Sequence, residues 1–196
     1  STIGGLERNL TPSEMLDQIY QIQRETKERI SNVVIMGTGE PLDNYDNILK
    51  FIEILTDENG LNISQRNITL STCGLVEKIY ELAKEKLQIT LAISLHAPND
   101  QIRSEIMPIA KKYSIDEVIE ACKYYFQSTG RRITIEYSLI QGVNDLEEDA
   151  NELAQKIKSL NCHINLIPVN PIRERDYKHS TSDGILKFKN ILEKKR

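Results

Sequence analysis

Short apolar, β-branched segments alternate with segments of helical periodicity along the whole chain. This alternation is typical of repeated strand–helix units. Most of the apolar segments are apolar at consecutive positions, which favours strands that are buried on both faces of a parallel sheet. The expected strands lie at residues 32–36, 67–71, 88–95, 132–139 and 163–168.

Two of the helices between these strands have a clear start signal. Thr11 stands three residues before Glu14, with Pro12 between them, which predicts an N-cap with a capping box. Ser114 and Glu117 repeat this spacing ahead of another apolar periodic segment. The sequence therefore predicts helices that begin directly after Thr11 and Ser114.

Two more helix starts carry only a single capping signal. One is expected at Asp43 or Asn44, and the other at Asn144 or Asp145. Parallel strands joined by such helices form either a barrel or a doubly wound sheet, and the periodicity alone leaves both possibilities open. In both architectures the functional residues belong in the loops at the carboxyl ends of the strands.

Length and charge limit the possible classes of protein. The chain has 196 residues, of which 39% are hydrophobic, so we expect one domain over residues 1–196. With 25 basic and 29 acidic residues the net charge is −4, which argues against broad non-specific attraction to nucleic acid but permits a local basic patch. No apolar run is long enough to cross a bilayer and no signal peptide is evident, so a soluble cytoplasmic protein is expected.

The cysteines indicate neither a disulfide framework nor a metal site. Cys73, Cys122 and Cys162 are 49 and 40 positions apart (122−73 and 162−122). This spacing lacks the close pairs that bind zinc or iron–sulfur clusters. We expect three small, partly buried thiols.

The loop after the first strand combines two glycines with an acid and a proline. Gly37 and Gly39 permit close approach of a ligand to the backbone, and Glu40 with nearby carbonyl groups can hold an ammonium group. An ordinary tight turn, in which Pro41 begins the next helix, is the alternative.

Polar residues also follow the second and third strands. Ser71 and Thr72 can bind a carboxylate or cap the next helix. Ser94 and His96 place a hydroxyl and an imidazole in one loop, where His96 is either an acid–base group or a hydrogen-bonded structural residue.

The last two strands add a carboxylate and an amide. Glu136 interrupts an apolar strand, so it either faces a ligand in the interior of a barrel or pairs with Arg131 or Arg132. Asn170 lies between two prolines, which stiffen the loop that presents its amide.

In this order, the loops resemble those of the radical-SAM methyltransferases that modify adenine C2 in 23S ribosomal RNA and transfer RNA. The resemblance covers the whole chain. Its most specific blocks are residues 36–44, 93–100, 134–137 with 142–145, and 165–171. It implies an α/β fold, a partial (β/α) barrel of the TIM type, that binds S-adenosylmethionine beside a [4Fe-4S] cluster.

The resemblance also assigns roles to the loops. It implies that Gly39 and Glu40 bind the methionine amino group, that Ser71 and the segment 94–96 bind the methionyl and ribose parts, and that Asn170 binds the nucleoside end. The cofactor-binding residues implied in this way are Gly39, Glu40, Ser71, Ser94, Leu95, His96 and Asn170.

The catalytic cysteines of that family have no counterpart here. The family holds its cluster with a Cys-x3-Cys-x2-Cys motif and carries the methyl group on another cysteine, and Cys73, Cys122 and Cys162 match none of these positions. The resemblance therefore implies a core truncated at both ends, without the first, cluster-bearing strand. We expect it to be inactive by itself and to bind the cofactor weakly.

The expected partners are 23S rRNA, tRNA and an electron donor such as flavodoxin, with no membrane and with the chain as a monomer. Most basic residues are expected to be solvated surface charge. With 6% aromatic residues and no tryptophan, no stacking platform for bases is evident. The candidates for RNA contact are Arg8, Arg66, Arg103, Lys111, Lys112, Arg131, Arg132, Arg173 and Arg175.

Three other functions compete with this interpretation. The related enzymes that methylate adenine C8 typically have alanine where Pro41 stands, so Pro41 favours the C2 reaction. Radical-SAM activating enzymes share the Gly-Glu-Pro loop but lack the blocks around His96 and Asn170. A non-catalytic RNA-binding module is the third alternative.

Overall fold

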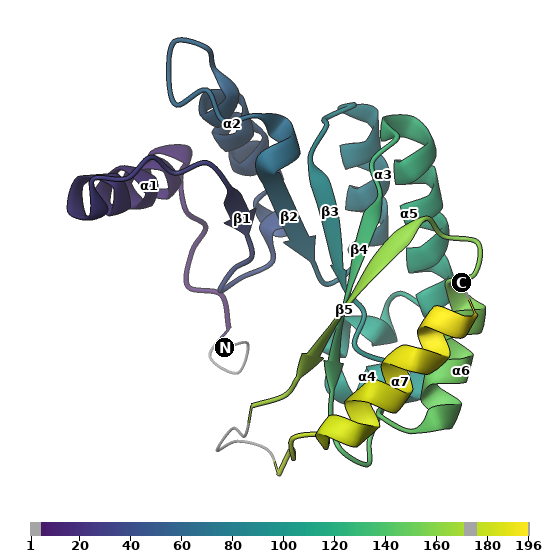
Figure 1. Ribbon diagram of the computed structural model, residues 1–196. Helices are drawn as coiled ribbons and strands as arrows, with labels where there is room; N and C mark the ends of the chain where they lie inside the picture. Colours follow the sequence, from purple (N-terminus) through teal and green to yellow (C-terminus); the bar gives the residue numbers. More distant parts are fainter. Residues whose placement is uncertain (1–4, 171–175, 196) are drawn as a thin grey trace.

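The structure is a computed structural model that describes residues 5–170 and 176–195. The described residues form a single five-stranded sheet in which every strand pair is parallel and the spatial order follows the chain order (Figure 1). The strands are β1 (Val33–Ile35), β2 (Ile68–Thr72), β3 (Thr90–Ser94), β4 (Ile133–Leu139) and β5 (Cys162–Pro168). The α-helices are α1 (Pro12–Thr26), α2 (Tyr45–Thr56), α3 (Val76–Lys84), α4 (Asp100–Ile106), α5 (Ile115–Thr129), α6 (Glu147–Lys156) and α7 (Ser182–Lys194).

The strand order decides between the two architectures that the sequence left open. A doubly wound sheet reverses its strand order at a switch point, whereas a barrel adds each strand beside the preceding one. The order β1-β2-β3-β4-β5 has no reversal. The expected α/β fold of the partial-barrel type is confirmed.

Burial alternates in the two edge strands, so the expectation of strands buried on both faces is wrong for β1 and β5, whereas β2, β3 and β4 are buried or half-buried at every position. In β5 the even-numbered positions are the less exposed ones, and in β1 Val34 is 58% exposed between less exposed neighbours. The strand registers place one alternating set of side chains on a common side, which we call the open face. It consists of Val34, Thr69, Ser71, Thr90, Ala92, Ser94, Thr134, Glu136, Ser138, His163, Asn165 and Ile167.

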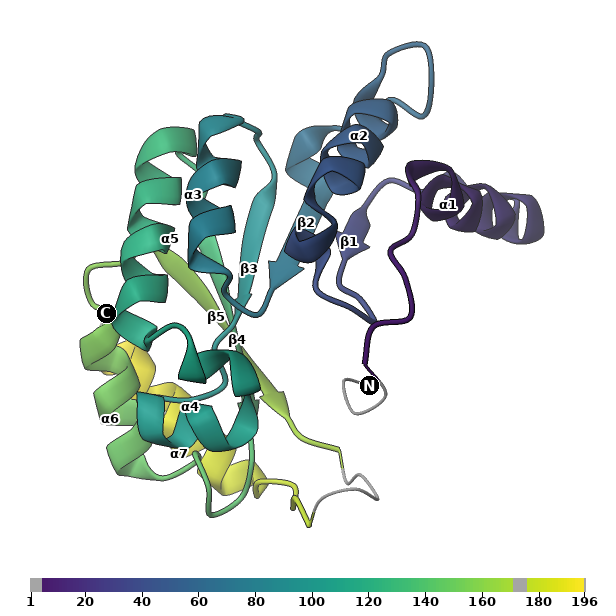
Figure 2. The same ribbon diagram turned by 180° about the vertical axis from the view of Figure 1, so that it is seen from behind.

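Helices cover the opposite face and form the core with it. Helices α3, α5 and α6 lie together on one side of the strands, and Figure 2 shows the same arrangement from behind. Leu91, Ile93 and Ile135 point into this layer and are at most 1% exposed. The rings of Tyr137 and Phe188 pack with 5.3 Å between their centroids, which fixes α7 against β4.

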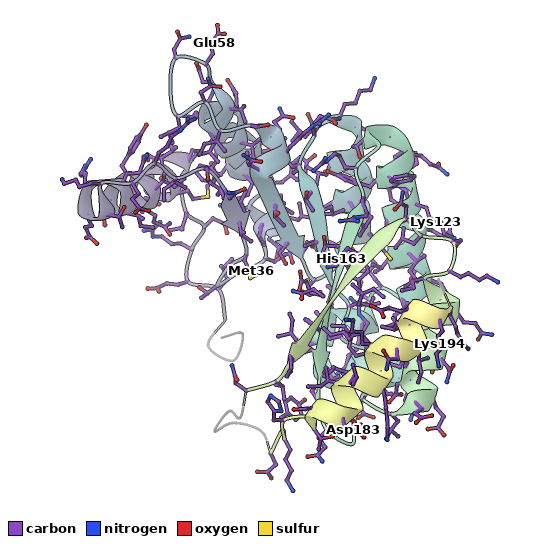
Figure 3. The ribbon with its side chains drawn as sticks, in the orientation of Figure 1. Met36, Glu58, Lys123, His163, Asp183 and Lys194 are labelled. Atoms are coloured by element: carbon purple, nitrogen blue, oxygen red, sulfur yellow. The ribbon has the colours of Figure 1, made fainter. Side chains whose placement is uncertain are left out.

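Figure 3 shows the difference between the two sides. Lys123 extends from α5 on the helical side, whereas Met36 lies on the other side of the sheet, directly after β1. Met36 is 60% exposed. On the open face itself, Val34 is 58% exposed and Ile167 is 38% exposed, so this face carries accessible apolar side chains as well as polar ones.

Both predicted capping boxes are confirmed. The Thr11 backbone N–H donates to Glu14 Oε2 at 2.8 Å, and the Glu14 N–H donates to Thr11 Oγ1 at 3.4 Å. Ser114 and Glu117 exchange the same two bonds at the start of α5. Each box satisfies backbone donors that the first helical turn leaves unpaired.

The two weaker capping predictions fare less well. Asn44 is the N-cap residue of α2, but its side chain makes no capping hydrogen bond. The prediction that Asn144 or Asp145 caps α6 is wrong, because Leu146 occupies the N-cap position. The side chains of Asn144 and Asp145 bind the preceding loop instead.

None of the helices in the described part of the chain combines the length and apolar character that spanning a bilayer would require.

Shortening a side chain to alanine is expected to change the free energy of unfolding differently on the two faces of the sheet. Replacing Ile93 by alanine removes a fully buried side chain, and we expect it to lower the free energy of unfolding by about 2–5 kcal/mol. The matched change Val34→Ala on the open face is expected to cost less than about 1 kcal/mol. Urea unfolding of both variants checks this, and equal losses would contradict the assignment of the faces.

Candidate functional site

The candidate site residues lie at one edge of the sheet. Gly39 and Glu40 follow β1, and Ser71 is the last residue but one of β2. Ser94 is the last residue of β3, and Leu95 and His96 follow it. Asn170 is exposed and stands two residues beyond β5. Because all the strands are parallel, their carboxyl ends meet at this edge.

Glu40 links the loops that follow β1 and β2. Its Oε1 accepts a hydrogen bond from the Leu42 N–H at 3.0 Å, and its Oε2 accepts one from the Cys73 N–H at 2.7 Å. Pro41 begins a short 3-10 helix, Pro41–Asn44, so the loop is also the tight turn that the sequence offered as an alternative. The carboxylate is thus held in place by backbone donors.

The glycines of this loop differ in their constraints. Gly37 has a φ of +126°, and a Cβ atom there would approach the backbone of Gly39 to 3.1 Å, so the turn requires glycine. A Cβ atom at Gly39 would meet nothing within 4 Å. The backbone of Gly39 is therefore open to a ligand, while Gly37 shapes the turn.

Ser71 and Thr72 do not cap the helix after β2. Helix α3 has Leu75 at its N-cap and no side-chain capping bond. The Thr72 hydroxyl accepts a hydrogen bond from the Gly74 N–H at 3.1 Å and closes the turn. Ser71 is 5% exposed and belongs to the open face.

His96 is held in one tautomer by its neighbours. Its backbone is in the left-handed region with a φ of 59°, and its Nδ1 accepts a hydrogen bond from the Ser138 N–H at 3.0 Å. Burial, followed by the positive charge of Arg103, lowers the pKa of His96 to about 4. The ring is therefore neutral at pH 7 and carries its proton on Nε2, which makes it a hydrogen-bond donor rather than an acid–base group.

Asn144 fixes the loop of His96 and was missed as a site-forming residue. Its fully buried side chain donates to the carbonyls of His96 and Ser138 at 2.7 and 2.8 Å. Its Oδ1 accepts from the Ile140 N–H at 2.7 Å. Asn144 thus joins the end of β3 to the end of β4, whereas the sequence marked it only as a candidate helix cap and as part of the block 142–145.

Arg103 is not a surface residue, so its prediction as an RNA contact is wrong. The side chain is fully buried and donates to three backbone carbonyls: Cys73 at 2.8 Å, Tyr113 at 3.2 Å and Leu95 at 3.3 Å. These carbonyls belong to the loops after β2 and β3 and to the start of α5. One guanidinium therefore holds two loops of the site in a fixed relation.

The other basic residues predicted to contact RNA lie in different surroundings. Arg8 forms an exposed ion pair with Glu14, and Arg131 donates to the Thr90 hydroxyl at 3.1 Å. Arg173 and Arg175 lie outside the described residues. The exposed candidates that stay predictions of RNA contact are Arg8, Arg66, Lys111, Lys112 and Arg132.

Glu136 pairs with neither Arg131 nor Arg132, so that alternative is wrong. Its Oε2 accepts a hydrogen bond from Asn165 Nδ2 at 2.8 Å, whereas the Arg131 guanidinium binds Thr90 on the neighbouring strand. Glu136 is only 9% exposed although it belongs to the open face. The carboxylate is thus oriented by one amide.

The cysteines behave as the sequence suggested. Cys122 and Cys162 are buried, and Cys73 is half-buried. Burial raises the pKa of the Cys73 thiol, and the nearby Glu40 carboxylate raises it further. Across residues 5–170 and 176–195, no group of three or more His, Cys, Asp or Glu side chains is arranged to hold a metal ion.

One cavity lies away from these loops. It has a volume of about 520 Å³ and is lined by α2 together with Gln65, Glu85 and Leu87. Gln65 and Leu87 precede β2 and β3, so this cavity is at the amino ends of the strands. Ligands of parallel α/β folds bind at the opposite, carboxyl end.

The sequence profile of the radical SAM superfamily matches residues 3–157. The chain belongs to the radical SAM superfamily. Members of this superfamily use S-adenosylmethionine and a [4Fe-4S] cluster.

Individual relatives are closely similar to the chain. Proteins named "Probable dual-specificity RNA methyltransferase RlmN" from Lachnospira eligens and Lachnoclostridium phytofermentans are 65% and 62% identical over 99% and 100% of it. The chain covers 55% of each of these relatives, so it spans about half of their length.

Solved structures share the fold of this chain. A radical SAM methyltransferase from Sphaerobacter thermophilus is 44% identical and superposes with a TM-score of 0.94 over 98% of the chain and 57% of that structure. A domain of pyruvate-formate lyase-activating enzyme from Bacteroides vulgatus is 19% identical over 85% of this chain and 95% of that structure, with a TM-score of 0.62. The second likeness shows the fold alone.

The residues of the site fit S-adenosylmethionine but not the cluster. The open backbone at Gly39, the hydroxyl groups on the open face and the His96 Nε2–H offer hydrogen-bonding groups at one edge of the sheet. A [4Fe-4S] cluster requires several thiolate ligands close together in space, and in the described part of the chain no three His, Cys, Asp or Glu side chains are grouped to hold a metal ion.

Arg103 provides a test of how the loops are held. Replacing it by methionine keeps an apolar stem but leaves three buried carbonyls without their donor, so we expect a loss of about 3 kcal/mol in unfolding free energy. The matched change Arg132→Met at an exposed position should cost less than about 0.5 kcal/mol. Chemical denaturation measures both, and a stability of Arg103→Met equal to that of Arg132→Met would refute the assigned role.

His96 predicts a dependence of stability on pH. Because its pKa is lowered from 6.5 to about 4 on folding, the unfolded chain binds the proton more tightly. The stability that the folded protein gains from keeping His96 neutral is therefore fully present above pH 6.5 and is lost as the pH falls toward 4. We expect wild type to lose about 2 kcal/mol more than His96→Asn between pH 7 and pH 4.5.

Asparagine is the chosen replacement because it tolerates the left-handed backbone and its Oδ1 can accept from the Ser138 N–H. Urea unfolding at several pH values supplies the measurement. His163→Asn, at an exposed position, is the control and should retain the wild-type dependence. The explanation fails if His96→Asn and wild type lose stability in parallel.

Proposed function

We propose that this chain is the cofactor-binding core of an enzyme that methylates C2 of adenine in 23S rRNA and in tRNA. The observation that carries the proposal is the series of polar groups along the carboxyl edge of the sheet, in a chain that is 65% identical to a relative named as a dual-specificity RNA methyltransferase. Pro41 in the first loop favours C2 over C8 as the methylated position.

Each loop has a proposed role in holding S-adenosylmethionine. Gly39 and Glu40 bind the methionine amino group, because open backbone and a carboxylate accept hydrogen bonds from an ammonium. Ser71 and Ser94 donate to the methionyl and ribose parts, and the neutral His96 adds its Nε2–H. Asn170 binds the nucleoside end. Leu95 completes this set with its place in the β3 loop.

When bound, the cofactor supplies the methyl group for the reaction. The described residues contribute binding and orientation, because Glu40, His96 and Asn144 are already fixed by backbone hydrogen bonds. They contribute no thiolate nucleophile, since burial and the neighbouring carboxylate raise the pKa of Cys73. The chemical step therefore depends on groups that these loops do not provide.

We further propose that these 196 residues alone do not methylate RNA. The spacing of the three cysteines provides no cluster motif, and the chain spans 55% of its relatives. In this proposal it is the full-length protein that acts on 23S rRNA and tRNA and receives electrons from a donor. We also propose that the full-length protein is cytoplasmic and monomeric.

The test uses the full-length protein with reconstituted cluster, reductant and S-adenosylmethionine. Purified 23S rRNA and tRNA should gain a methyl group at adenine C2, as identified by digestion and mass spectrometry of the nucleosides. A product methylated at C8 would overturn the proposed position, and unchanged RNA would overturn the enzyme class.

The 196-residue chain itself is the second sample in this experiment. It is expected to produce no methylated nucleoside and to bind S-adenosylmethionine much more weakly than the full-length protein in a calorimetric titration. Tight binding by the isolated chain would show that the described loops suffice, and would contradict the proposed dependence on the cluster.

A further inference from the structure

We propose that Glu136 is a further binding residue of the cofactor site, and that its carboxylate accepts hydrogen bonds from the ribose hydroxyls of the adenosyl group. This inference rests on the proposed function, since it assumes that S-adenosylmethionine lies along the carboxyl edge of the sheet. It adds β4 to a site otherwise built from the four strands β1, β2, β3 and β5.

Glu136 stands in a row of polar side chains that crosses three strands. The strand registers pair Ser94 with Glu136 and Glu136 with Asn165. Side chains in register on neighbouring parallel strands point to the same face and are about 5 Å apart. The hydroxyl, the carboxylate and the amide therefore adjoin one another on the open face.

Among the described residues, one amide orients the Glu136 carboxylate. Asn165 Nδ2 donates to Glu136 Oε2 at 2.8 Å, and within the described ranges no lysine or arginine forms an ion pair with Glu136. A carboxylate that is 9% exposed needs further hydrogen bonds. A ligand with hydroxyl groups on the open face supplies them.

The strand order selects the ribose as that ligand group. In the proposed binding mode the methionine amino group lies at Gly39 after β1, and the nucleoside end lies at Asn170 after β5. Strands β3 and β4 lie between these ends, next to the middle of the cofactor, which is the ribose. Its two adjacent hydroxyls are donors, and a carboxylate is the usual partner of ribose hydroxyls in nucleotide sites.

The test is calorimetric binding of S-adenosylhomocysteine to the full-length protein. Glu136→Gln keeps the size of the side chain but removes its charge, so we expect binding to weaken about tenfold or more. The 2′-deoxy and 3′-deoxy analogues of the ligand should bind wild type more weakly than the parent ligand. In Glu136→Gln this preference for the intact ribose should largely disappear.

Two further variants separate this role from a general effect on folding. Glu58→Gln, an exposed position far from the open face in Figure 3, is the matched control and should bind like wild type. Asn165→Leu leaves Glu136 in place but removes its orienting donor, and should weaken binding in the same direction by a smaller factor. Thermal unfolding of each variant verifies that it is folded.

The outcomes distinguish this inference from the proposed function. If wild type binds the ligand and Glu136→Gln keeps the same preference for the intact ribose, the inference is wrong and the proposed function stands. An analogue of the ligand with a modified adenine base serves as a further probe. If Glu136→Gln changes only the discrimination against this analogue, Glu136 contacts the adenine rather than the ribose, and the inference is also wrong. If wild type does not bind S-adenosylhomocysteine, both proposals fail.

Discussion

The geometry of the site depends on one buried cation. Arg103 is fully buried, and its guanidinium donates to the carbonyls of Cys73, Leu95 and Tyr113. A buried charge is costly unless its donors are satisfied, so the loops after β2 and β3 are constrained to bring their carbonyls to it. The same charge helps to lower the pKa of His96. Loop position and the neutral state of the imidazole thus have a common origin.

Strand order converts this local constraint into an ordered site. In a sheet with no reversal, consecutive loops are neighbours, so a long ligand meets them in the order of the chain. Glu40 connects the first loop to the second, Arg103 the second to the third, and Asn144 the third to the end of β4. Each connection is a side chain that binds the backbone of a neighbouring loop.

The sequence predicts the repeated units, both capping boxes and the loops of the site, because these features depend on residues close together in the chain. It does not predict the alternating burial of the edge strands β1 and β5, since an apolar residue such as Val34 makes the open face of β1 resemble a buried one. The positions of Arg103 and Asn144 are also not predictable locally. Arg103 lies in a short helix where arginine is ordinarily solvated, and its partners are 8, 10 and 30 residues away.

The distribution of hydrogen bonds explains why such a site can be both polar and well ordered. Glu40 and His96 accept from backbone N–H groups, so their acceptor atoms are fixed before any ligand is present. Because these side chains are already ordered, little binding free energy is spent on ordering them when a ligand binds. Glu136 differs, because an exposed amide from Asn165 orients it instead of the backbone. A carboxylate held by a side chain is less rigidly fixed than one held by the backbone, so the Glu136 carboxylate can reorient toward another hydrogen-bond donor, whereas Glu40 cannot.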